Sequence, residues 1–153
     1  MIQAKESTVQ ITRSGIISSF FIAVPEKGAA ATKELNLPVF IDFDISKSND
    51  SKKFQIFLTV QSNTDQKKPG YAFEITLLGD FKVDEDDPDK RGKLVLYSAL
   101  PSLINHARTI LTTLSSQSMH GPYVMPMIDV QQLINDSKEK PTKAKKIRKK
   151  SEA

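Results

Sequence analysis

The sequence predicts an α+β fold: a four-stranded antiparallel sheet, then a long amphipathic helix and a short C-terminal helix. Before residue 84, apolar side chains alternate in short runs, which is the period of strands, and all eight phenylalanines lie between Phe20 and Phe81. After residue 99, apolar residues recur every three or four positions, which is the period of a helix. Strands followed by helices in one chain of 153 residues indicate a single α+β domain.

We expect strands over residues 9–24, 39–45, 54–61 and 71–83. The segments between the last three are rich in Ser, Asn, Asp, Pro and Gly, which are the residues of turns. Because consecutive strands joined by short polar turns pair as neighbours, the pattern predicts an antiparallel meander. Gly15 marks a possible break in the first strand, and Gly79 a bulge or a close contact in the fourth.

The expected strands carry apolar side chains on both faces. In the third strand, Phe54, Ile56, Leu58 and Val60 fill one face and Phe57 lies on the other. An antiparallel sheet with one face in water should instead alternate apolar and polar residues. We therefore expect the second face to be covered by the chain's own helices, by another copy, or by apolar segments of other polypeptides.

The expected long helix carries one apolar stripe, formed by Leu100, Leu103, Ile104, Ala107, Ile110, Leu111 and Leu114. Pro101 suits its first turn, and the Gly-Pro pair at 121–122 stops the helical pattern. Asp129 and Gln132 have the spacing of a capping box for a short second helix that runs through Asn135.

Positive charge is concentrated at the C-terminus. Residues 138–153 hold eight Lys or Arg against two Glu, whereas the net charge of the whole chain is +4, so residues 1–137 are slightly acidic. We expect a folded domain over 1–137 and a disordered basic tail over 138–153. The chain has no cysteine, no secretory signal and no apolar run of about 20 residues, so the expected location is cytoplasmic.

Six stretches, taken in order and spacing, resemble the SecB family of protein-export chaperones. Residues 18–25 (SSFFIAVP) resemble its aromatic first strand, and residues 35–44 (LNLPVFIDFD) its Pro followed by apolar residues alternating with Asp. Residues 54–62 and 71–81 resemble its third and fourth strands, with Glu74 at the position of an acidic residue. Residues 100–108 (LPSLINHAR) resemble the start of its main helix, and residues 123–134 its closing segment.

This resemblance implies a homotetramer built as a dimer of dimers, and a role in protein transport or export. It also implies ATP-independent binding of unfolded polypeptides in long apolar grooves, with no cofactor. We expect assembly through the edge of the first strand and through the long helix. The residues expected to contact client polypeptides are Phe20, Phe21, Phe40, Phe57, Leu78, Tyr123 and Met125.

The sign of the tail departs from the family, whose export members end in an acidic or neutral tail that helps dock the motor SecA. This reversal argues against the tail contact with SecA. Asp42, Asp44 and Glu74 could still form an acidic surface for a motor, or be ordinary solvated carboxylates. The tail itself could bind a polyanion or serve as a solubilising end, and its basic residues include Lys143, Lys145, Lys146, Arg148, Lys149 and Lys150.

Two further functions stay open beside a general chaperone. One is a nucleic-acid- or ribosome-associated protein anchored by the basic tail, and the other is a SecB-like chaperone specific for an antitoxin. An enzyme is not expected, because the sequence has no nucleophile elbow, phosphate-binding glycine loop or cysteine. A metal site is not expected either: His106 and His120 lack a third ligand, and the acidic run 84–89 lacks the ligand spacing of a calcium loop.

Overall fold

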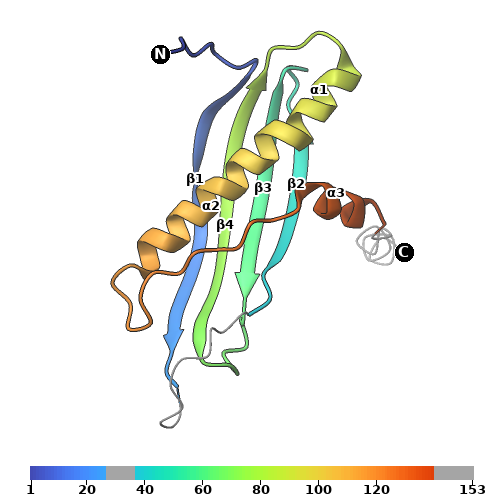
Figure 1. Ribbon diagram of the computed structural model, residues 1–153. Coiled ribbons are helices and arrows are strands. Elements are labelled where there is room, and N and C mark those ends of the chain that lie inside the picture. Colours follow the sequence, from blue (N-terminus) through green and yellow to red (C-terminus); the bar gives the residue numbers. More distant parts are fainter. Residues whose placement is uncertain (27–36, 140–153) are drawn as a thin grey trace, which may run out of the picture.

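The computed structural model describes residues 1–26 and 37–139, which form one antiparallel sheet with a layer of helices on one face (Figure 1). The predicted α+β fold is confirmed. The strands are β1 (Val9–Val24), β2 (Phe40–Lys47), β3 (Lys53–Ser62) and β4 (Gly70–Val83). The helices are α1 (Pro88–Leu94), α2 (Leu100–Ser115) and α3 (Val130–Glu139), and a π-helical turn over Val95–Ala99 joins α1 to α2.

The strand order is β1-β4-β3-β2. The predicted meander therefore holds for β2, β3 and β4, but β1 lies beside β4 at the opposite edge from β2. A simple four-strand meander was the wrong prediction for this strand. Only tight turns force neighbours to pair, and the connection from β1 to β2 is longer than a turn.

The core lies between the central strands and α2. Ile56, Leu58 and Val60 of β3, with Phe73, Ile75, Leu77 and Phe81 of β4, are buried on the face that the helices cover. Five members of the predicted helical stripe are buried there as well, namely Leu100, Leu103, Ile104, Ala107 and Leu111. Leu114, the last member, is exposed, whereas Ser115 at the end of α2 is buried, so the buried stripe continues through Ser115 and leaves Leu114 at its margin.

Helical structure begins twelve residues before the predicted start, at Pro88 rather than Leu100. Asp87 caps α1, since its carboxylate accepts a hydrogen bond from the backbone N–H of Asp89 at 3.0 Å, and Pro88 occupies the first turn. Pro101 consequently lies inside a continuous helical run. A proline there has no N–H to donate and would crowd the carbonyl one turn earlier, and the wide turn over Val95–Ala99 lies directly before it.

An extended segment over residues 121–129 returns across the helix layer and leads into α3 (Figure 1). Arg108 of α2 fastens this segment, because its guanidinium donates to the carbonyls of Met125 at 3.0 Å and Pro126 at 2.8 Å. The predicted cap of α3 is present, with the carboxylate of Asp129 accepting from the N–H of Gln132 at 3.0 Å.

α3 continues through Glu139, four residues beyond the predicted end, so residues 138 and 139 belong to a helix rather than to the tail. The other tail residues, 140–153, lie outside the described part of the chain. Among the helices that the structure describes, none combines the length and apolar character needed to span a membrane.

Candidate functional site

The face of the sheet that carries no helix, here called the open face, displays aromatic rings to solvent. Phe40 of β2 is 58% exposed, Phe57 of β3 is 40% exposed and Phe20 of β1 is 37% exposed. The described helices all lie on the opposite face (Figure 1). Alternation along each strand produces this arrangement, because a face filled by core residues leaves the intervening ring pointing the other way.

Strand register interleaves these rings with carboxylates. One row across the sheet reads Phe20, Glu74, Gln61 and Phe40, with the two phenylalanines on the edge strands. A second row reads Gly15, Leu78, Phe57 and Asp44; it lies four residues further along β2, β3 and β4 and five along β1, where the register shifts. Phe57 and Leu78 are therefore direct cross-strand neighbours, and together they form an apolar strip at the centre of the open face.

The polar residues of the open face are unequally paired. Asp80 accepts from Gln55 and from Arg13, each at 2.8 Å, and these two contacts, the Gln55 hydrogen bond above all, lower the pKa of its carboxyl. Asp42, Asp44 and Glu74 are exposed, and no described residue forms an ion pair or hydrogen bond with their side chains. Among the described residues, these three carboxylates have no ionic partner, and they lie beside exposed rings; their role as a surface for a motor stays a prediction.

The remaining three predicted contact residues lie on the helix-covered side. Phe21 stacks on Tyr71 with ring centroids 5.2 Å apart, and Tyr123 lies 5.7 Å from Tyr71 and 5.3 Å from Phe73. Burial raises the pKa of the Tyr123 phenol. This cluster holds the extended segment against the sheet.

Met125 follows Tyr123 and is 1% exposed, so its side chain belongs to the core and offers no surface to a client. The expectation for Met125 is corrected on this ground. Its neighbours Val124 and Met127 point outward and are strongly exposed. Alternation in an extended segment explains the exposure of Val124, although the sequence does not say which side faces the core. Met127 lies two residues after Met125 and is exposed nonetheless, so the alternation does not continue past Met125.

Sequence reasoning missed the exposed apolar residues of β1. Ile11, Ile16, Ile17 and Ile22 are all exposed on this edge strand. The register with β4 shifts between Ile11 and Arg13 and again between Ile16 and Ser18, so two bulges interrupt the simple alternation. Those bulges are the reason why counting alternate residues failed here.

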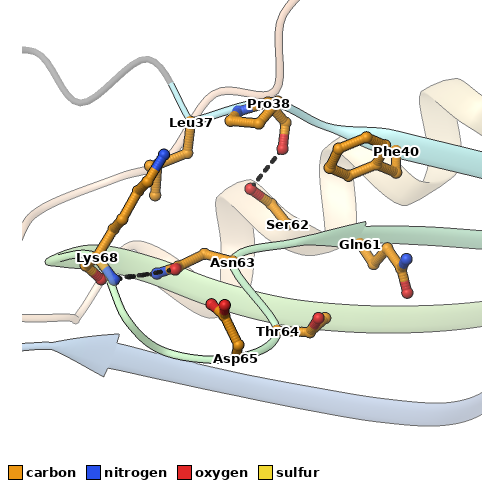
Figure 2. A pocket seen from close by; sticks show the side chains of 9 residues that line it. All are labelled: Leu37, Pro38, Phe40, Gln61, Ser62, Asn63, Thr64, Asp65 and Lys68. Atoms are coloured by element: carbon orange, nitrogen blue, oxygen red, sulfur yellow. Dashed lines mark hydrogen bonds between the residues drawn. The ribbon is translucent and has the colours of Figure 1, made fainter.

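A cavity of about 250 Å³ opens at the end of the sheet where β2 begins and β3 ends (Figure 2). Leu37, Pro38 and Phe40 supply its apolar wall. Ser62 stabilises that wall by donating its hydroxyl to the Pro38 carbonyl at 2.8 Å, and polar turn residues around Asn63 form the other side. The pocket extends the apolar surface around Phe40 over the end of the sheet.

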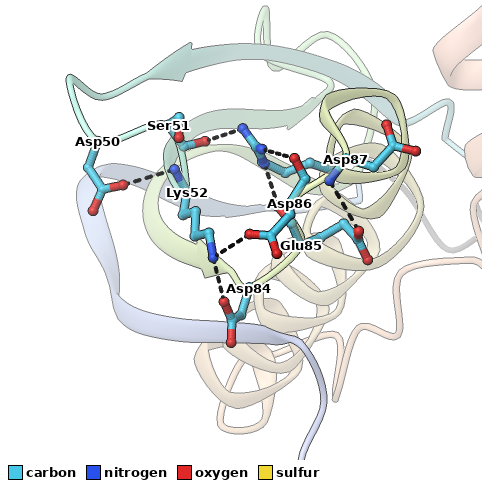
Figure 3. Close-up of polar contacts among 8 residues, drawn as sticks. Asp50, Ser51, Lys52, Asp84, Glu85, Asp86 and Asp87 are labelled. Atoms are coloured by element: carbon cyan, nitrogen blue, oxygen red, sulfur yellow. Dashed lines mark hydrogen bonds and ion pairs between the residues drawn. The ribbon is translucent and has the colours of Figure 1, made fainter.

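The acidic run 84–89 is organised by cations of the same chain (Figure 3). Lys52 contacts Asp84 at 2.9 Å and Asp86 at 3.0 Å, which raises the pKa of the Lys52 ammonium to about 12. Arg91 is buried and donates to the carbonyls of Ser51, Glu85 and Asp86 at 3.0, 2.8 and 2.8 Å. The run is thus a loop folded around one arginine and neutralised in part by one lysine.

The two histidines have structural partners. The Nδ1 atom of His106 lies 3.1 Å from the Ser14 hydroxyl, which joins α2 to β1, and the Nε2 atom of His120 lies 2.8 Å from the Val24 carbonyl. Over residues 1–26 and 37–139, no cluster of three or more His, Asp or Glu side chains is placed to hold a metal ion.

Comparison with known proteins gives a likeness of fold. No family model matches the sequence, and no curated protein matches it. Among solved structures, the SecB-like chaperone Rv1957 of Mycobacterium tuberculosis, in complex with a ChAD peptide from the Rv1956 HigA1 antitoxin, superposes with a TM-score of 0.53. The two sequences are 12% identical, and the match covers 79% of this chain and 91% of that chain.

A protein of unknown function from Streptococcus agalactiae matches with a TM-score of 0.43 and 9% identity, over 78% of this chain and 97% of that chain. The first likeness shows that the chain has a SecB-like fold.

Proposed function

We propose that this protein is an ATP-independent chaperone that holds non-native polypeptides on exposed apolar surface. The observation that carries the proposal is the open face, on which Phe20, Phe40 and Phe57 remain exposed although the opposite face already supplies a complete core. A likeness of fold to a SecB-like chaperone solved with a bound peptide supports it. Exposed rings in register across a sheet are typical of a surface that accepts a partner.

Binding on such a surface needs no chemical step. Each Å² of apolar surface removed from water contributes about 25 cal/mol, so a long client segment can bind without a fixed sequence. A folded client buries the same apolar segments in its own core and therefore does not compete for the surface. The consequence is selective retention of unfolded chains.

The client range separates two versions of this function. A broad chaperone, including one that serves export, binds many unfolded proteins with similar affinity, whereas an antitoxin-specific chaperone binds one partner tightly. The antitoxin peptide in the Rv1957 structure makes the second version a specific candidate. Titration of several unrelated unfolded proteins and one antitoxin segment distinguishes the two.

We further propose that copies of the chain assemble through β1 and α2. β1 is an edge strand with exposed isoleucines. The outer side of α2 bears Ser102, Thr109 and Thr113, whose hydroxyls already donate to carbonyls one turn earlier in the helix, at 2.8, 3.2 and 2.9 Å. Covering such a side leaves those hydroxyls hydrogen-bonded, so its desolvation costs little. Light scattering tests the assembly: a dimer of dimers gives about four times 17.1 kDa.

Aggregation of a chemically unfolded client tests the chaperone itself. The purified protein is expected to slow light scattering by the diluted client without ATP, and no effect at molar excess would contradict the proposal. Removing residues 140–153 distinguishes the nucleic-acid- or ribosome-associated alternative. Retained client binding supports the chaperone, whereas loss of all partner binding supports anchoring by the tail.

A further inference from the structure

The middle of the open face combines apolar and acidic character without a cation. Asp42 and Asp44 lie on β2 on the same side as Phe40, and Glu74 lies across the sheet in the row of Phe20. Alternate residues of a strand are about 6.8 Å apart, so Asp42 and Asp44 present two carboxylates at that spacing. A partner that fits this surface is extended, carries positive charges at alternate positions, and has long apolar stems to lie over phenyl rings.

The chain itself contains such a segment. Residues 143–150 read Lys-Ala-Lys-Lys-Ile-Arg-Lys-Lys, with six cations and no anion. In an extended strand, Lys146, Arg148 and Lys150 would share one side at the same spacing of about 6.8 Å. Their methylene stems can cover Phe40 and Phe57 while their charged ends reach the carboxylates.

The point where the described chain ends makes the contact reachable. α3 ends at Glu139 on the β2 side of the helix layer (Figure 1), and β2 is the strand that carries Asp42 and Asp44. Each residue spans up to about 3.3 Å, so the four steps from Glu139 to Lys143 span up to about 13 Å and the seven steps to Lys146 up to about 23 Å. Packed layers lie about 10 Å apart, so about 20 Å of chain leads from the helix layer past the edge of β2 to the other face of the sheet.

The acidic run 84–89 is the competing binding site for the basic segment, but two of its carboxylates already form ion pairs. Lys52 holds Asp84 and Asp86, as described above (Figure 3). Asp42, Asp44 and Glu74 have no such partner among the described residues. Glu85, Asp87 and Asp89 of the acidic run also have no cation partner among the described residues, but the carboxylates of the open face lie beside exposed phenylalanine rings, which the stems of a basic segment can cover.

We propose that the open face binds the basic C-terminal segment 143–150, of the same chain or of a neighbouring copy in an oligomer. Resting on the proposed function, this contact makes the segment a tethered competitor that covers Phe40 and Phe57 until a client displaces it. Tethering supplies an effective concentration on the order of millimolar, so individually weak ion pairs suffice. High salt or a polyanion removes the competitor and frees the surface.

Zero-length crosslinking of the full chain tests the contact directly. A carbodiimide joins lysines to carboxylates that are in ion-pair contact, and mass spectrometry maps the linked peptides. We expect links from lysines 143–150 to Asp42, Asp44 and Glu74, and their loss in about 0.5 M salt. A mixture of isotopically light and heavy protein tells links within a chain from links between copies.

Two triple variants make the result specific. Asp42→Asn/Asp44→Asn/Glu74→Gln removes the three unpaired carboxylates of the open face. If these carboxylates hold the tail there, the variant should also lose any link from the tail to Asp80, which lies on the same face. The control Asp65→Asn/Glu85→Gln/Asp89→Asn removes three carboxylates elsewhere, two of them exposed and Glu85 half-buried, and should leave the open-face links unchanged. Links confined to the acidic run would overturn the proposal. So would tail lysines that link to no carboxylate of the open face, which is also the result expected if the tail binds RNA instead.

The regulatory consequence has a separate readout. Replacing the six cations of 143–150 by Gln should tighten client binding by about tenfold at low salt and leave it unchanged at high salt. Equal client affinities at low salt would contradict competition. Crosslinking does not depend on clients, so a protein that shows the links but suppresses no aggregation refutes the chaperone function and leaves the tail contact standing.

Discussion

Gly79 of β4 lies directly against Leu103 of α2. A methyl carbon added at Gly79 would be 3.2 Å from the Cδ1 atom of Leu103 and 2.6 Å from the Cε2 atom of Phe81. The missing side chain therefore lets the helix approach the sheet at the centre of the core. The sequence prediction of a close contact at Gly79 is correct, and β3 and β4 keep their register through this position.

Replacing Gly79 with Ala should destabilise the fold by about 1 to 3 kcal/mol, because Phe81 and Leu103 must move away from the new methyl group. Urea unfolding followed by circular dichroism measures the change. The matched control is Gly15→Ala on the neighbouring strand, where a Cβ meets nothing within 4 Å and the effect should stay within about 0.5 kcal/mol. Equal effects at the two positions would refute the packing argument.

Replacing Arg91 with Ala should lower the free energy of unfolding by about 2 kcal/mol or more, since three carbonyls lose their donor. Arg91→Lys should recover part of the loss, because one ammonium cannot reproduce the planar fork. Thermal unfolding compares these variants with Lys90→Ala, an exposed neighbour. If the Lys90 variant is as unstable as Arg91→Ala, the loop is not organised by the guanidinium.

Asp80 should make stability depend on acid pH. Its folded pKa lies below the ordinary value of 3.8, so its contribution is complete above that value and is lost as pH falls through the folded pKa. Urea unfolding between pH 5 and pH 2 should show a smaller loss for Asp80→Asn than for the natural chain. An NMR titration should also show that Gln55→Ala raises the pKa of Asp80; no rise would refute the assigned cause.

Substitutions on the open face should reduce client binding, whereas substitutions in the core should reduce stability. Phe40→Ser/Phe57→Ser should weaken suppression of client aggregation and cost less stability than a core substitution, because Phe40 is 58% and Phe57 40% exposed. Met125→Ala should instead cost about 2 to 5 kcal/mol of stability, because its side chain is buried. Client binding measured beside unfolding distinguishes the two classes. If the double variant suppressed client aggregation fully, the client would bind at a surface other than the one around Phe40 and Phe57.

The sequence predicts those parts of the fold that depend on local periodicity. The strand with Phe54 and Phe57 and the helical stripe from Leu100 to Leu111 were found because their neighbours repeat at 2 or about 3.6 residues. The capping pair Asp129 and Gln132 was found because its spacing is fixed by one turn of helix.

Features that depend on contacts between distant parts of the chain were not predicted from the sequence. The seven residues of α1 are mostly polar and hold no apolar stripe, and β1 pairs with β4 across more than forty residues of chain. For the site, alternation placed Phe40 and Phe57 away from the core strand faces. It did not say which face the helices would cover. Met125 was assigned to the wrong class of residue because the sequence does not say which side of the extended segment 121–129 faces the core.

The π-helical turn over Val95–Ala99 sets the phase between the two ends of the helical run. Each residue of an α-helix advances the chain by about 100° around its axis. Deleting one residue here would rotate Arg91 by about that angle relative to Leu103. Either Arg91 would then lose its hydrogen bonds to the loop carbonyls, or Leu103 would lose its packing against Gly79. The wider turn thus acts as a spacer that lets one continuous helical run make both contacts, that of Arg91 with its loop and that of Leu103 with Gly79.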